Sequence, residues 1–197
     1  MVFSEVIKLK DGIFNNLNYH QNRVDNTLKS FKQPPIDLSI IKNMIPEYAH
    51  NGIYKCKILY SDAIEKIDFM PYTFRKIDTL EIIIDNNIDY SYKYADRSYI
   101  DKLVKKSSCD DIIIIKNGYV TDSSYSNLVF RLKDELVTPK HYLLPGTKRQ
   151  SLIDNGKIKT KKINLEDIFK YDSVYFINAM IDLEDNVGCS ITNIHVI

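Results

Sequence analysis

The stretch CDDIIIIKNGYVTDSSYSNLVF, residues 109–130, joins four consecutive isoleucines to a series of short polar residues. The isoleucine run is typical of a buried strand, and Asn117-Gly118 is a strong signal for a two-residue hairpin turn. A carboxylate, Asp122, then stands between two strand-like runs, followed by Ser123, Ser124, Ser126 and Asn127. One interpretation is a polar hairpin loop. The other is a carboxylate that hydroxyls and amides position for a bound group.

The chain before this stretch predicts an antiparallel sheet with one or two helices. Asp11-Gly12 lies within an alternating segment and predicts a hairpin. Residues 18–31 repeat with a period of about four, which predicts a helix that ends before Pro34-Pro35. A shorter helix is expected within residues 37–49. Strands are predicted at residues 52–61, 63–72 and 79–87.

The remaining segments complete an α+β pattern. Helices are predicted at residues 97–108, 146–158 and 164–171. Gly156 should close the second of these, and Asn164 and Asp167 should cap the third. A hairpin should turn at Lys133-Asp134, and residues 173–183 should form the last core strand. We expect a small N-terminal α+β lobe, residues 1–86, and a larger C-terminal lobe, residues 87–197.

Composition disfavours several classes of protein. The 197 residues are 44% hydrophobic and carry a net charge of +1, so the basic excess of a nucleic-acid-binding protein is missing. Three cysteines without CxxC spacing and four scattered histidines predict reduced thiols and no metal site. No apolar run reaches the roughly 20 residues of a membrane helix, and the N-terminus does not resemble a signal peptide. We therefore expect a cytoplasmic protein that does not bind membranes.

Four residue patterns could carry chemistry. Lys93 lies among tyrosines in IDYSYKYADRS, where partial burial would lower its pKa and make it a nucleophile, with an ordinary surface lysine as the alternative. Asp122 could hold a protonated ring nitrogen. Gly146-Thr147 opens a helix whose N–H groups favour phosphate. Arg23 offers a fork that suits phosphate, with a solvated arginine as the alternative. Together, an amine, a carboxylate and two anion sites describe one ligand, pyridoxal 5′-phosphate.

In this light the chain resembles the class IV aminotransferases, the fold-type IV enzymes that depend on pyridoxal phosphate. The family includes branched-chain aminotransferases, D-amino acid aminotransferases and 4-amino-4-deoxychorismate lyases. Five segments match its motifs in order: YHQNRVDNT, YSYKYADRS, CDDIIIIKNGYVTDSSYSNLVF, LVTPKHYLLPGTKRQSLIDNGKI and DSVYFINAM. The resemblance implies a two-lobed enzyme like D-amino acid aminotransferase, shortened at its N-terminus, that acts on a small amino substrate. It also implies a homodimer.

The resemblance assigns roles to individual residues. Lys93 would form the Schiff base with the cofactor and move the proton, and Arg97 would meet a substrate carboxylate unless it forms a structural ion pair with Asp96 or Asp101. The remaining positions would bind the cofactor: Arg23, Asp122, Ser123, Ser124, Asn127, Gly146, Thr147, Lys148, Ala179 and Met180. Asp122 replaces the family's glutamate and is one methylene shorter, and Lys8 stands where many members have arginine.

Two short segments favour the lyase within this family. KYADR is similar to the lyases' KHLNR, and INAM is similar to their NAL at the end of the last strand. The expected reaction forms 4-aminobenzoate and pyruvate, in folate synthesis. A branched-chain or D-amino acid aminotransferase is the alternative, and a non-catalytic relative of the fold is a second one.

Overall fold

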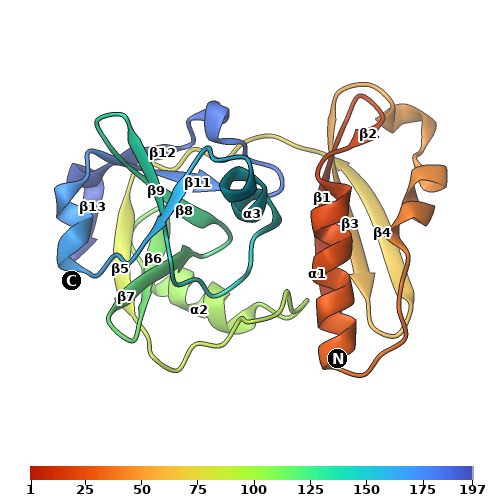
Figure 1. Cartoon of the computed structure of the whole chain (residues 1–197), viewed down its shortest axis with the longest axis horizontal. Coiled ribbons are helices and arrows are strands. Elements are labelled where there is room, and N and C mark those ends of the chain that lie inside the picture. Colours follow the sequence, from red (N-terminus) through yellow and green to blue (C-terminus); the bar gives the residue numbers. More distant parts are fainter. Residues whose placement is uncertain (197) are drawn as a thin grey trace. The chain divides into compact units, whose positions relative to one another are not determined.

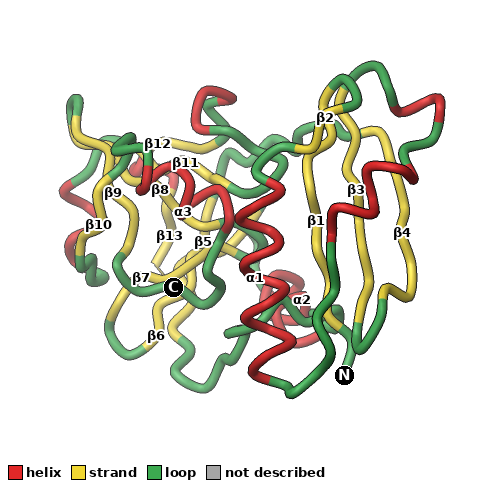
Figure 2. The backbone as a smooth tube through the Cα atoms, turned by 45° about the vertical axis from the view of Figure 1, so that its right-hand side comes forward, coloured by secondary structure: helices red, strands yellow, loops and turns green. Residues whose placement is uncertain are grey.

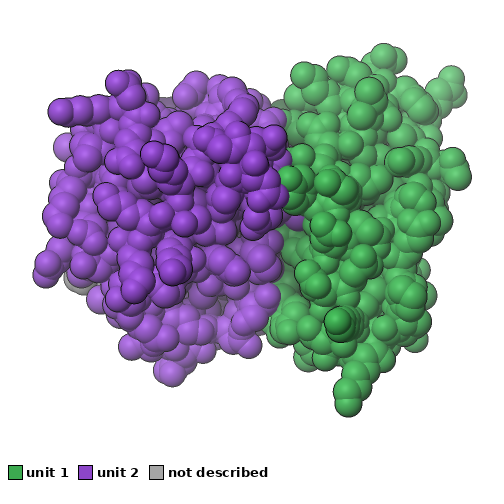
Figure 3. Space-filling view, in the orientation of Figure 1, with its two compact units in different colours: residues 1–73, 92–96 green, residues 74–91, 97–197 purple. Residues whose placement is uncertain are grey.

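The computed structural model describes residues 1–196 and divides the chain into two compact units (Figure 3). Unit 1 consists of Met1–Thr73 and Tyr92–Asp96, and unit 2 consists of Phe74–Ser91 and the chain from Arg97 onward. The mixture of helices and sheets confirms the predicted α+β class.

Unit 1 is a four-stranded antiparallel sheet in the order β2-β1-β3-β4. Its strands are β1 (Phe3–Lys10), β2 (Ile13–Phe14), β3 (Ile53–Tyr60) and β4 (Ile64–Pro71). The predicted hairpin is confirmed, because Asp11 and Gly12 both have positive φ, 48° and 78°, as a type I′ turn requires. Helix α1 (Leu17–Ser30) lies along one face of this sheet (Figures 1 and 2).

The core of unit 1 forms where α1 meets the sheet. Val24 and Leu28 of the helix pack with Ile7, Cys56 and Ile58 of the strands. The shorter helix expected within residues 37–49 is instead a pair of 3₁₀ helices, Leu38–Met44 and Glu47–Ala49. Pro46 between them lacks a backbone N–H and restricts the residue before it, so a continuous α-helix cannot pass through.

Unit 2 is built around a larger mixed sheet in the order β10-β9-β8-β7-β6-β5-β13, with β11 pairing with β8 and β12. The strands are β5 (Leu80–Ile84), β6 (Asp111–Lys116), β7 (Tyr119–Ser123), β8 (Asn127–Leu132), β9 (Glu135–Pro139), β10 (Lys159–Lys161), β11 (Ser173–Ile177), β12 (Gly188–Ser190) and β13 (Ile194–Val196). The isoleucine run lies in β6, where Ile112–Ile115 are at most 1% exposed. The hairpins at Asn117-Gly118 and at Lys133-Asp134 are both confirmed.

The helices of unit 2 follow the sequence closely. The predicted segments form α2 (Ser98–Lys106), α3 (Thr147–Asp154) and the 3₁₀ helix Glu166–Lys170, and two short 3₁₀ helices, Leu183–Asp185 and Ile191–Asn193, lie further along the chain. Gly156 follows α3 with a φ of 67°, which allows it to close the helix. Asn164 and Asp167 exchange side-chain to backbone hydrogen bonds of 2.9 and 3.1 Å, as a cap would, although the residue directly before the 3₁₀ helix is Leu165. The strand predicted at residues 173–183 is confirmed as β11, which ends at Ile177, but it is not the last strand, because β12 and β13 follow it.

The structure divides the chain differently from the expected boundary between residues 86 and 87. Strand β5 belongs to unit 2, because it pairs in parallel with β6 and β13. Lys93 belongs to unit 1, because Tyr92 and Tyr94 pack their rings against Phe3 of β1. The lysine and the expected phosphate loop therefore lie in different units. The pairing of a short irregular segment with a distant strand left no periodic signal in the sequence.

Candidate functional site

Lys93 is attached to the first strand of unit 1. Its carbonyl oxygen accepts a 2.8 Å hydrogen bond from the backbone N–H of Ser4, and Tyr94 forms a β-bridge with Phe3. The Ala95 N–H donates to Val2 at 3.0 Å, which continues the attachment. Lys93 is half-buried. The backbone of the predicted catalytic lysine is thus held against β1 although 89 residues separate it from Ser4.

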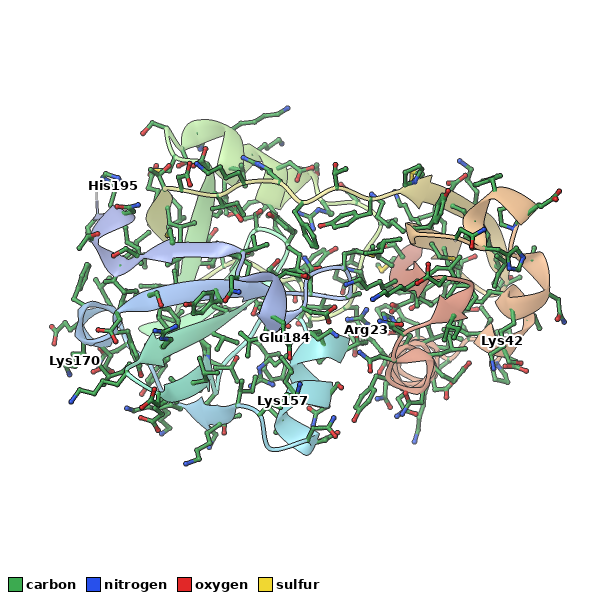
Figure 4. The ribbon with its side chains drawn as sticks, turned by 90° about the horizontal axis from the view of Figure 1, so that it is seen from above. Arg23, Lys42, Lys157, Lys170, Glu184 and His195 are labelled. Atoms are coloured by element: carbon green, nitrogen blue, oxygen red, sulfur yellow. The ribbon has the colours of Figure 1, made fainter. Side chains whose placement is uncertain are left out.

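Arg23 lies on α1 (Figure 4) and is only 8% exposed, so the solvated arginine considered above is wrong. Its Nε and Nη2 each donate a 2.7 Å hydrogen bond to the carboxylate of Glu5, which is wholly buried. Nδ1 of His20 lies 2.7 Å from the same carboxylate. The buried Arg23 guanidinium, with two hydrogen bonds to Glu5, forms a far stronger pair than a surface ion pair such as Lys157–Glu184 (Figure 4), whose side chains are more than half exposed.

The charges of this cluster are fixed by its burial and its partners. Burial alone would raise the pKa of the Glu5 carboxyl, but the charge of Arg23 and hydrogen bonds from His20 and Arg23 outweigh it and lower that pKa to about 2. Burial lowers the pKa of His20, and the positive charges of Arg23 and Lys93 lower it further against the effect of Glu5. Burial and the charge of Glu5 raise the pKa of the Tyr60 hydroxyl. At neutral pH the cluster thus contains an ionised Glu5, an ionised Arg23 and a neutral His20 that donates from Nδ1.

Asp122 is the acid at the centre of a second buried polar cluster, in unit 2. It lies on β7 and is 5% exposed, and Ser123, Ser124, Ser126 and Asn127 around it are also buried. A solvent-facing polar loop is therefore wrong. Asn127 Nδ2 donates to one carboxylate oxygen at 2.7 Å, and the N–H groups of Leu143 and Leu144 donate to the other at 3.0 and 2.9 Å. The hydrogen bonds hold the carboxylate between β7, β8 and the loop before α3.

Burial raises the pKa of the Asp122 carboxyl to about 6, against hydrogen bonds from Leu144, Asn127 and Leu143 that lower it. A raised folded-state pKa contributes stability below the ordinary value of 3.8, and that contribution is lost as the pH rises through about 6. We therefore expect the wild type to lose unfolding free energy relative to Asp122→Asn as the pH rises from 4 to 7. Urea denaturation of the chain without added ligand would measure it, and parallel pH profiles would contradict it.

The predicted phosphate loop opens α3. Gly146 precedes the helix, and Asn127 packs so closely on it that a Cβ there would lie 1.7 Å from Asn127 Oδ1. Because Asn127 also holds Asp122, this glycine joins the helix start to the buried carboxylate. Thr147 and Lys148 follow in the first turn and are buried. The Lys148 amine pairs with Asp182, so its charge is partly neutralised.

The other predicted binding residues mainly shape the backbone around Asp122. Ser123 Oγ accepts a 3.1 Å hydrogen bond from the Ser126 N–H, which tightens the turn between β7 and β8. The carbonyl of Ser124 accepts a 2.8 Å bond from Arg97, which also lies 3.7 Å from Asp101. Arg97 therefore has the structural ion pair that was its alternative interpretation.

The segment after β11 closes over the same turn. Asn178 donates from Nδ2 to Ser126 Oγ at 2.9 Å, and its Oδ1 accepts from the Met180 N–H at 2.8 Å. Ala179 lies between these two residues. The predicted pair Ala179 and Met180 is thereby tied to the turn between β7 and β8, in the same unit as Asp122.

Sequence reasoning missed several members of both clusters. Glu5 gave no signal, because an acid on an alternating strand is ordinary, and His20 lies in the matched segment YHQNRVDNT but was given no role. Arg149 was also missed: it is 5% exposed, it donates to the Pro139 carbonyl at 2.8 Å and it stacks over Tyr142. Its position two residues into a helix near Asp122 could have been a signal. Nothing in the sequence indicated that Asp182 would pair with Lys148.

Two kinds of feature are absent from residues 1–196: membrane-spanning helices and clusters of metal-binding side chains. No helix in this part of the chain is long and apolar enough to cross a membrane. No group of three or more His, Cys, Asp or Glu side chains there is placed to hold a metal ion.

Comparisons with known proteins agree with these features. The family model for amino-transferase class IV matches residues 90–183. An uncharacterised protein of Haemophilus influenzae (strain ATCC 51907 / DSM 11121 / KW20 / Rd) is 36% identical over 180 residues, which cover 89% of this chain and 96% of the relative. The crystal structure of a "putative 4-amino-4-deoxychorismate lyase" from Haemophilus somnus 129PT is 34% identical, with a TM-score of 0.83, and the match covers 91% of this chain and 96% of that one.

A more distant structure shows the same fold. The PLP-bound form of a hypothetical aminotransferase from Mycobacterium tuberculosis is 14% identical, with a TM-score of 0.79, and the match covers 98% of this chain and 81% of that one. Two comparisons lead to the same family. The class IV model matches residues 90–183, and the sequence is 34% identical to the Haemophilus somnus structure over nearly the whole chain. The chain belongs to the class IV aminotransferase family.

Proposed function

We propose that this chain binds pyridoxal 5′-phosphate and acts as a 4-amino-4-deoxychorismate lyase. The observation that carries the proposal is the buried carboxylate of Asp122, which by the resemblance to the family would face the pyridine nitrogen. The lyase is favoured over other family activities by the likeness to the Haemophilus somnus protein and by the KYADR and INAM segments.

The donors and acceptors around Asp122 fit the cofactor. A carboxylate has about four lone-pair positions, and three hydrogen bonds from protein groups occupy three of them. One acceptor position on Oδ1 is left for a protonated ring nitrogen. Such a cation would also offset the burial that raises the pKa of Asp122, so ligand and carboxylate would stabilise each other's charged forms. The first turn of α3 offers the positive end of a helix dipole to a phosphate.

The side chains would then divide the work. When bound, pyridoxal phosphate supplies an electron sink for bonds at the substrate's amino-bearing carbon. Lys93 would provide the amine that anchors the cofactor, and its Nζ would take up and return the proton. Asp122 would keep the ring nitrogen protonated. Arg23, Gly146, Thr147 and Lys148 would hold the phosphate, with the backbone of Ala179 and Met180 beside them.

A transaminase is the second candidate, because the family model and the Mycobacterium tuberculosis structure carry that name and the same side chains would serve both reactions. In a lyase, Lys93 would return its proton as pyruvate leaves and the ring becomes aromatic. In a transaminase, its Nζ would take the proton from the amino-bearing carbon of the substrate, and a keto acid would leave. By analogy with the family we further propose a homodimer.

One experiment separates the candidates. The purified chain is incubated with pyridoxal phosphate, freed of excess cofactor and mixed with freshly made 4-amino-4-deoxychorismate, while the fluorescence of 4-aminobenzoate is followed. Growth of the signal supports the lyase. A cofactor-loaded chain that forms no product but transfers amino groups from L- or D-amino acids to 2-oxoglutarate or pyruvate supports the transaminase. A chain that stays colourless contradicts both activities.

A further inference from the structure

Glu5 lies at the centre of the buried polar cluster in unit 1. Its side chain is 0% exposed and accepts from Arg23 Nε and Nη2, while His20 Nδ1 approaches within 2.7 Å. Both oxygens are therefore committed to α1. Nothing given by the sequence motifs or by the comparisons assigns a role to this acid.

Glu5 also lies next to the attachment point of Lys93. The residue before it, Ser4, donates its backbone N–H to the Lys93 carbonyl. The positive charge of Lys93 is close enough to His20 to lower the pKa of that imidazole. One acid on β1 thus holds two side chains of α1, and the charge of the predicted catalytic amine acts on one of them, His20.

A buried ion pair such as Glu5–Arg23 contributes little net stability to a protein core. Removing two charges from water costs several kilocalories per mole, and apolar side chains of similar size commonly stabilise a core as well or better. The bidentate fork, by contrast, fixes the direction of an arginine in a way that apolar packing cannot. The pattern therefore indicates orientation of Arg23 rather than simple cohesion.

We propose that Glu5 is the positioning residue of the site: it orients Arg23 toward the cofactor phosphate and holds His20 through the same carboxylate. This role rests on the proposed binding of pyridoxal phosphate. Glu5 touches neither cofactor nor substrate in this scheme. It acts through the direction of the Arg23 fork and through its negative charge, which favours a protonated nitrogen at Lys93.

The test uses Glu5→Gln, which keeps the shape and removes the charge. Glu81→Gln is the matched control, since Glu81 is a buried acid of unit 2, 7% exposed, that the proposed site does not use. Two quantities are measured on each folded variant: the dissociation constant for pyridoxal phosphate, and the pH at which the visible absorbance of the lysine-bound cofactor changes. Loss of an orienting partner at bound-metal sites typically weakens affinity about 10- to 100-fold, and we expect a loss of about ten-fold or more here.

We also expect the spectral transition of Glu5→Gln to move down by about one pH unit, because a nearby negative charge is lost. The control should keep the wild-type affinity and transition. A second variant, Glu5→Asp, retains the charge and withdraws the carboxylate by one methylene. Its carboxylate still neutralises the charge of Arg23, so the variant should fold. It should weaken cofactor binding, and its spectral transition should move less than that of Glu5→Gln.

The outcomes distinguish the two proposals. A folded Glu5→Asp or Glu5→Gln that binds and titrates like the wild type overturns the role of Glu5 and leaves the proposed function standing. A control that loses as much affinity as the Glu5 variants also overturns it, since any buried acid would then have the same effect. A wild-type chain that forms no coloured complex overturns the proposed function itself.

Discussion

Replacing Lys93 by alanine is expected to abolish the visible absorbance of the cofactor-loaded chain and to lower 4-aminobenzoate formation by about a thousand-fold or more. Proton transfer by a positioned side chain alone contributes about 10²- to 10⁴-fold, and here the same amine would also anchor the cofactor. The measurement is an absorbance spectrum after removal of free pyridoxal phosphate, followed by the product assay on the same sample.

The control for this variant is another lysine of unit 1. Lys66 is 62% exposed and pairs with Asp68 on the surface, and Lys66→Ala should keep both colour and activity. The fold should survive Lys93→Ala, because the backbone carbonyl of residue 93, which accepts the hydrogen bond from Ser4 of β1, is kept in the alanine variant. A Lys93→Ala protein that keeps the wild-type spectrum would rule out Lys93 as the anchor.

Replacing Arg23 by methionine is expected to lower the unfolding free energy of the chain by about 3–5 kcal/mol at neutral pH. The substitution leaves Glu5 as a buried charge that has lost its main partner, and breaking one side of a buried ion pair has a cost of that order. Equilibrium denaturation in urea, without cofactor, would measure the loss. Arg131→Met serves as the matched control, because Arg131 is exposed and should change stability little.

The pH dependence gives this prediction a second signature. The pKa of Glu5 is lowered from 4.5 to about 2 in the folded chain, so its stabilising contribution is complete above pH 4.5 and is lost as the pH falls toward 2. The gap between the wild type and Arg23→Met should therefore be widest above pH 4.5 and should narrow in acid. An unfolding free energy for Arg23→Met within about 1 kcal/mol of the wild type at neutral pH would show that the pair is not the tight buried contact described above.

Local patterns in the sequence predicted most of the secondary structure. Turns such as Asp11-Gly12 and Asn117-Gly118 depend on backbone conformations that few residues adopt, so their positions could be predicted without tertiary information. The same holds for the helix before Pro34-Pro35 and for the cap at Asn164. The failures came where packing decides: the 3₁₀ helices around Pro46, and β12 and β13, which are too short to show a period.

The residues named for the site came from motif order rather than from geometry. Lys93, Asp122 and the Gly146 loop could be identified because each has a fixed neighbour pattern in the family. Their partners could not, because hydrogen bonds such as Glu5 to Arg23 and Asp182 to Lys148 join residues 18 and 34 positions apart. Only the folded chain brings such pairs together.

The sequence by itself therefore determined the α+β class, the family, and which amine and which acid to test. The tertiary structure decided how each group is charged and held. It buried Asp122 so that its pKa rises, it enclosed Glu5 so that Arg23 and His20 must satisfy it, and it joined Lys93 to β1. The physical reason is that burial and partner distance set these properties, and both are relations between distant segments rather than properties of any one segment.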